Sequence, residues 1–160
     1  MKRLFTKERL VYWPEEFSGV VDQLNARTAD GKSIGAGLYS FNTGAIVLAA
    51  ALGVQQGRKR EVGSQRKEIS TGTFASHHLE RYILLIPLLG NNDLTVDALR
   101  PENEESLIRE FERYAAGGLE YLNGRLEEAA GQSIDMVIQR MATTISRAGP
   151  SADELPDLMG

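Results

Sequence analysis

Residues 43–57 read TGAIVLAAALGVQQG, and this run decides the expected fold. From Ala45 to Val54 every residue except Gly53 is apolar, so a helix over this run is apolar nearly all round. A helix of that kind is normally buried, and we expect it to form the centre of the core. Crossing a bilayer takes about 20 apolar residues, so the run is too short to span a membrane. Gly57 is a natural helix C-cap.

Apolar residues recur at helical spacing on both sides of this run. They predict helices that begin near Pro14, Phe74 and Pro101, and a last one marked by Ile134 to Ile145. The fold class we expect is mainly α: a single compact domain of about five helices over residues 1–148, with room for a short β-hairpin near residues 30–41. Residues 149–160 hold two Pro and three acidic residues, which is typical of a flexible acidic tail.

The helix expected after Pro101 carries a long apolar stripe that includes a glycine. Because Gly is costly inside a helix, a Gly on a buried stripe is most simply explained by another backbone packing against it. The same stripe is a candidate interface between two copies of the chain, which gives four candidate interface residues: Phe111, Tyr114, Gly118 and Leu122.

The chain has 160 residues, no Cys and a formal net charge of −4. The absence of Cys excludes disulfides, thiolate nucleophiles and cysteine metal sites, and it favours a reducing, cytoplasmic setting. The net charge is not that of a polycation, so any DNA contact has to come from a local basic patch. No export signal is expected at the N-terminus.

Motifs that carry catalysis are weak in this sequence. The adjacent pair His77 and His78 would point about 100° apart on a helix, which does not favour one shared metal ion. Residues 30–33, DGKS, lack the earlier glycine of a P-loop, and no Gly-x-Ser-x-Gly elbow occurs. We therefore expect no catalytic residues, no metal and no cofactor. An enzyme using one histidine with a carboxylate is the weakest hypothesis.

The acidic stretch 102–112 alternates with arginines. Glu105 and Arg109 are four residues apart, which is the spacing of an ion pair on a helix surface. We interpret the whole stretch as a solvated helix face.

Basic residues are concentrated in two segments. Residues 58–68 carry a net charge of +3, and so do residues 1–13. Lysines and arginines of this kind contact DNA phosphates, while the alternative is a solvated loop after a helix C-terminus. The candidate DNA-binding residues are Arg58, Lys59, Arg60, Arg66, Lys67, Lys2 and Arg3.

Two blocks of the chain resemble a known family. Residues 41–59, which contain FNTGAIVLAAALG and end in GRK, and residues 111–120, FERYAAGGLE, are similar to the Dnd-system-associated proteins. These proteins are encoded beside DNA phosphorothioation genes, in systems whose associated proteins restrict unmodified DNA. The resemblance implies a defence context and supplies no active site.

The leading hypothesis is a non-enzymatic accessory protein of a phosphorothioation-linked antiphage restriction system. It would bind the DNA backbone, other proteins of the system, or both, without spanning a membrane. The alternative is a self-associating structural or regulatory helical protein, such as a homodimer, without DNA contact.

Overall fold

The computed structural model describes residues 4–25, 42–91, 95–128, 136 and 138–140. Within these residues the chain is mainly helical and has one two-stranded antiparallel sheet, which confirms the predicted fold class. The described elements in chain order are β1 (Leu10–Pro14), the 3-10 helix η1 (Glu15–Phe17), α1 (Ser18–Leu24), α2 (Asn42–Gln56), β2 (Arg66–Ser70), α3 (Thr71–Ser76), α4 (Glu80–Gly90), η2 (Val96–Leu99), η3 (Pro101–Asn103) and α5 (Glu104–Glu128).

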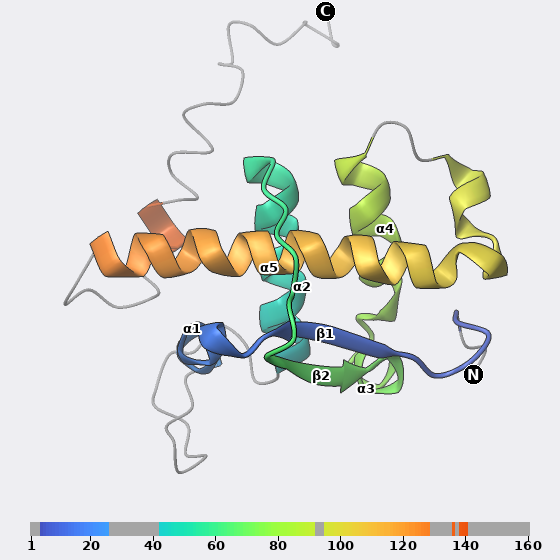
Figure 1. Ribbon diagram of the computed structural model, residues 1–160, viewed down its shortest axis with the longest axis horizontal. Coiled ribbons are helices and arrows are strands. Elements are labelled where there is room, and N and C mark those ends of the chain that lie inside the picture. The colour runs from blue at the N-terminus through green and yellow to red at the C-terminus, as the bar shows by residue number, and fades with distance from the viewer. Residues whose placement is uncertain (1–3, 26–41, 92–94, 129–135, 137, 141–160) are drawn as a thin grey trace, which may run out of the picture.

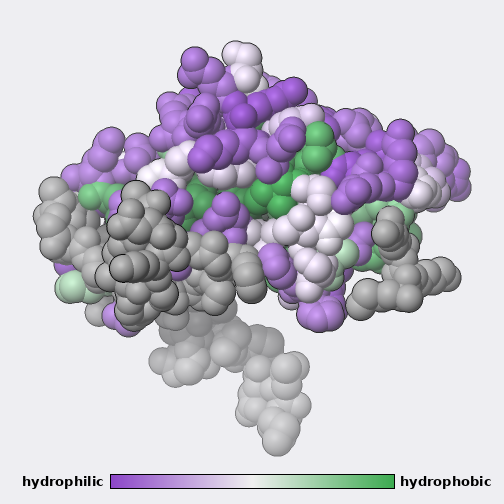
Figure 2. Space-filling model, turned by 90° about the horizontal axis from the view of Figure 1, so that it is seen from below, coloured by the Kyte–Doolittle hydropathy of each residue, from purple (hydrophilic) through white to green (hydrophobic). Residues whose placement is uncertain are grey.

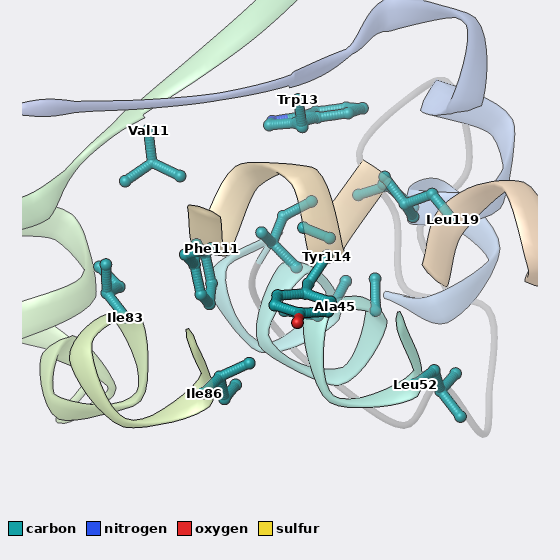
Figure 3. Close-up of a cluster of buried hydrophobic side chains, with 14 of the residues drawn as sticks. Val11, Trp13, Ala45, Leu52, Ile83, Ile86, Phe111, Tyr114 and Leu119 are labelled. Atoms are coloured by element: carbon teal, nitrogen blue, oxygen red, sulfur yellow. The ribbon is translucent and has the colours of Figure 1, made fainter. Parts of the chain in front are cut away.

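The long helix α5 runs through the middle of the molecule (Figure 1). Helices α2 and α4 cross it steeply and lie side by side, and both pack against it and against each other. Strand β1 contacts α5 from another side, and α1 follows β1 to pack on α2 and α5. Side chains from β1, α2, α4 and α5 converge in the core between these elements (Figure 3).

Helix α2 is the central element that its sequence predicts. Ala45, Ile46, Ala49 and Ala50 have no exposed surface. The helix ends in a Schellman motif at Gly57, whose φ is +62°. The N–H of Gly57 donates to the Val54 carbonyl, and the next N–H donates to the Gly53 carbonyl.

Glycines bring α2 and α5 together backbone to backbone. A Cβ atom on Gly118 of α5 would lie 1.7 Å from the carbonyl oxygen of Ala49 on α2. A Cβ on Gly53 of α2 would lie 2.1 Å from the carbonyl oxygen of Tyr114 on α5. The expectation that another backbone packs against Gly118 is confirmed, and that backbone belongs to the same chain.

The sheet was not expected from the sequence, which predicts a short β-hairpin only near residues 30–41. β1 and β2 pair antiparallel, with Val11 opposite Ile69 and Trp13 opposite Lys67. Val11 and Trp13 face the core, as Figure 3 shows. Pro14, which has no N–H to give to a ladder, is the last residue of its strand.

One expected helix is divided in two. In place of the single helix predicted to begin near Phe74, the chain forms α3, a turn at His77 and His78, and α4, which contains Pro87 and ends at Gly90. Residues 136 and 138–140 are helical and fall within the last predicted helix. The hairpin expected near 30–41 and the tail 149–160 lie outside the described residues.

Candidate nucleic-acid interface

Three of the candidate basic residues, Arg58, Lys59 and Arg60, lie on a segment that crosses α5. Residues 57–65, which we call the strap, pass from the end of α2 over α5 to the start of β2 (Figure 1). The Arg60 N–H donates to the Arg113 carbonyl of α5 at 3.0 Å. Gly117 lets the strap lie close, because a Cβ there would be 2.4 Å from the Arg58 carbonyl oxygen.

Two of the predicted cations on the strap are paired with carboxylates. The Lys59 ammonium contacts Glu110, and this hydrogen bond raises the pKa of Lys59. The Arg60 guanidinium contacts Glu16 and lies 3.2 Å from a carboxylate oxygen of Glu120. These two charges are largely neutralised within the chain and hold the strap on α5.

Three other predicted cations, Arg58, Arg66 and Lys67, are exposed and have no carboxylate within 4 Å among the described residues. Each lies over an aromatic ring, which orders the side chain and leaves it without a direct ion pair among the described residues. Their distances to the ring centroids are 5.1 Å for Arg58 on Tyr121, 3.8 Å for Arg66 on Tyr12 and 5.6 Å for Lys67 on Trp13.

The sequence alone did not reveal the aromatic rings over which these cations lie. Tyr12 and Trp13 precede Arg66 by more than fifty residues, and only the pairing of β1 with β2 brings them together. The β-branched and aromatic residues Val11, Tyr12 and Trp13 are the signal that could have indicated a strand there. Lys2 and Arg3 lie outside the described residues, so their relation to this cluster stays a prediction.

The surface around these elements is strongly polar. On the face that Figure 2 shows, most of the described side chains are hydrophilic, and the hydrophobic ones lie in a band across the centre. Carboxylates are interspersed with the cations, as the pairs of Glu61 and Glu110 with Arg113 illustrate. Among the described cations of the strap and β2, those without a carboxylate within 4 Å are Arg58, Arg66 and Lys67.

The stripe proposed as an interface between copies lies in the core of one chain. Phe111 and Leu122 have no exposed surface, Tyr114 is 3% exposed, and Gly118 packs on α2. The Tyr114 hydroxyl donates to the Gly90 carbonyl at 2.8 Å. Since these four residues are packed inside the chain, they present no surface to a second copy in this fold.

The acidic stretch 102–112 is only partly the solvated face that was expected. The Glu105–Arg109 pair forms at 2.9 Å, as the spacing predicts. Glu104 and Glu112, however, are each 4% exposed, so the interpretation is wrong for these two residues. They point toward β1 and the segment before it, an arrangement that helical spacing alone does not reveal.

Both buried carboxylates hold the N-terminal segment on α5. Glu112 accepts the Tyr12 N–H at 2.8 Å and a hydrogen bond from Arg109. Glu104 accepts a hydrogen bond from the Arg9 guanidinium at 3.0 Å. Through Glu112 and Arg109, α5 covers the edge of β1 that β2 leaves free.

The two histidines occupy different environments at the end of α3. The Nδ1 atom of His77 lies 2.7 Å from the Thr43 hydroxyl at the start of α2. His78 is exposed and has a φ of +60°, a conformation that favours glycine. It is the left-handed residue of a Schellman motif in which the Leu79 N–H donates to the Phe74 carbonyl.

Replacing His78 with Gly is expected to stabilise the chain by up to about 1 kcal/mol, because a left-handed non-glycine residue is strained. A thermal melt compared with the wild type measures this. Ser76→Gly, in the right-handed last turn of α3, is the matched control and should lose roughly 0.5–1 kcal/mol. A His78→Gly variant less stable than the wild type would contradict the expectation.

A cavity of about 440 Å³ lies between the end of α4, η2 and the first half of α5. Its charged groups are already engaged with carboxylates or cations of the chain, which gives no preformed site for an anion. Its lining residues are Asn91, Ala98, Asn103, Ser106, Leu107, Arg109, Glu110 and Arg113.

The described residues offer neither a metal site nor a membrane-spanning helix. No group of three or more His, Asp or Glu side chains is arranged to hold a metal ion in this part of the chain. No described helix has the length and apolar character needed to cross a membrane.

Comparison with known proteins gives one match. The model of a family described as DNA sulphur modification system-associated protein 4 matches residues 11–158. No curated protein and no solved structure matches the chain.

Proposed function

The chain belongs to the DNA sulphur modification system-associated protein 4 family, and we propose that it serves such a system as a non-enzymatic accessory protein that contacts the DNA backbone. The family match supports the accessory role, because it covers most of the chain, including both blocks on which the resemblance to Dnd-associated proteins rests. The defence role against unmodified DNA is part of the same proposal.

The observation that carries the DNA contact is a set of cations on the strap and β2 that have no direct ion pair among the described residues. Arg58, Arg66 and Lys67 are exposed, ordered on aromatic rings and free of carboxylate partners among the described residues. A guanidinium held in this way loses less side-chain entropy when it binds a phosphate. Since Lys59 and Arg60 are committed to carboxylates, their contribution to DNA contact is smaller.

This interface would act on the backbone without reading bases. Arg58 lies on the strap and Arg66 and Lys67 lie on a five-residue strand, so none of the three is on a helix that could enter the major groove. Phosphate contacts fix position and orientation but carry no sequence information. The affinity is therefore expected to be modest and strongly dependent on salt.

The double variant Arg58→Gln/Arg66→Gln is expected to bind duplex DNA more weakly and with a salt slope smaller by about 2, since each lost phosphate contact removes about 0.9. Filter-binding titrations at several salt concentrations measure the slope. Arg100→Gln/Arg125→Gln, which removes two exposed arginines elsewhere, should leave the slope unchanged.

Equal slopes for the two double variants would contradict the location of the interface. No binding of the wild type at low salt would contradict DNA contact altogether. In that case the accessory role would rest on protein partners of the system, which the family match supports equally.

A further inference from the structure

Helix α4 has the composition of a helix that is buried on every side. From Tyr82 to Gly90 it reads YILLIPLLG, with no charged residue and no polar group except the Tyr hydroxyl. Helices that are apolar all round are normally buried, because removing each apolar side chain from water stabilises the folded protein. Its charged residues, Glu80 and Arg81, stand in the first turn.

The described structure covers only one side of this helix. Ile83 and Ile86 are buried against the core. On the opposite side Tyr82, Leu85 and Leu89 are 38%, 44% and 75% exposed. Their spacing of three and four residues places them on one helical face. We call this the α4 face. Val96 and Leu99 of η2, the next described element, are also 79% and 37% exposed.

We propose that a second copy of the chain covers the α4 face, with the two α4 helices antiparallel about a twofold axis near Leu85. A twofold contact joins a surface to itself, so the face has to be self-complementary. The stripe meets this condition, since Leu85 lies near its middle and Tyr82 of one copy would lie beside Leu89 of the other.

The charges at the ends of α4 fit the antiparallel arrangement. Arg81 has no carboxylate within 4 Å among the described residues, and the last turn of α4 has no basic residue. Antiparallel pairing brings Arg81 of one copy to the C-terminal end of α4 in the other. There it would meet the negative end of the helix dipole, where α4 has no basic residue of its own. A parallel pairing would instead place the two Arg81 side chains together.

The α4 face is small for a protein interface. Stable complexes bury about 800 Å² on each partner, contributed by 20 to 30 residues, and one helix of 11 residues with a short neighbour offers fewer. The association is therefore expected to be weak, with a Kd on the order of micromolar or above. It has to be measured at high protein concentration.

Sedimentation of the full chain over a concentration series tests the proposal. The mass is expected to rise from the 17.6 kDa of one chain toward twice that value. Leu85→Lys should abolish the rise and keep the melting profile, because Leu85 is 44% exposed in one chain. Leu10→Lys, a similar change at a position on β1 that is 37% exposed, is the matched control and should still dimerise.

Cysteine cross-linking locates the axis independently. Because the chain has no Cys, Leu85→Cys introduces a single thiol, and oxidation should give a disulfide-linked dimer. Leu10→Cys should give little. A wild type that stays monomeric throughout the series would overturn the proposal and leave the face to a different protein. Dimerisation that Leu85→Lys does not weaken, or equal cross-linking of both cysteine variants, would overturn it as well.

Discussion

Gly118→Ala is expected to destabilise the chain by about 3 kcal/mol or more, the upper range for overpacking a well-packed core. The added Cβ would lie 1.7 Å from the Ala49 carbonyl oxygen, a backbone atom that moves only if α2 moves. Alanine improves helix propensity by roughly 1 kcal/mol, which does not offset such an overlap. For a chain of this size the melting temperature should fall by roughly 10 °C.

The control for this experiment lies on the same helix. A Cβ on Gly124 meets no atom within 4 Å, so Gly124→Ala should gain roughly 0.5–1 kcal/mol from helix propensity alone. Urea unfolding of both variants and the wild type measures the difference. If Gly118→Ala were as stable as Gly124→Ala, the close crossing of α2 and α5 would be contradicted.

The helical framework was predictable because its signals are local. The apolar run 43–57 identifies α2 as the central helix, and the stripe through Gly118 indicates a backbone packed against α5. Gly57 marks the end of α2. Each of these predictions depends on residues within a few turns of one another, where helical periodicity fixes which side chains share a face. Periodicity does not show which element packs against an apolar stripe. The stripe through Gly118 was assigned to a second copy of the chain, whereas α2 of the same chain packs against it.

The sheet and the charged clusters depend on contacts between distant segments. β1 and β2 are separated by more than fifty residues, and each strand has only five. In so short a run the sequence pattern does not distinguish a strand from a turn of helix. Whether a predicted cation is paired with a carboxylate or lies exposed over an aromatic ring depends on this strand pairing and on the path of the strap. The sequence shows that Arg58 and Lys59 are basic. Only the fold pairs Lys59 with Glu110 and places Arg58 over an aromatic ring.

Buried Glu112 shows how such a contact changes the chemistry of a side chain. Burial raises the pKa of Glu112 above its ordinary value of 4.5, although the Tyr12 N–H and Arg109 act in the opposite direction. For Glu105 and Glu110 burial also opposes ionisation, but neighbouring cations prevail and lower their pKa. Carboxylates on one helix therefore affect stability with opposite signs as the pH changes.

Glu112→Ala is expected to cost about 1–3 kcal/mol, the usual effect of leaving a buried hydrogen-bond donor without its acceptor. It leaves the Tyr12 N–H without its acceptor and takes one of two carboxylates from Arg109. Glu112→Gln keeps an oxygen that can accept the Tyr12 N–H and removes the buried charge, so its cost should be smaller. Urea unfolding at neutral pH measures both variants, and equal costs would contradict a role for the Tyr12 hydrogen bond.

The pH dependence of stability, compared between the wild type and Glu112→Gln, isolates the effect of the Glu112 charge. With a raised pKa, folded Glu112 keeps its proton to a higher pH than it does in the unfolded chain, so the folded state binds more protons between the two pKa values. Stability from this group therefore falls as the pH rises from about 4.5 through the folded pKa, and it is constant above that. Glu105 and Glu110 act oppositely, since their contribution is present above 4.5 and is lost as the pH falls. Because both are retained in Glu112→Gln, the stability of the wild type relative to this variant should decline with rising pH across that window. A difference that stays flat, or rises with pH, would mean that the Arg109 ion pair outweighs the burial of Glu112.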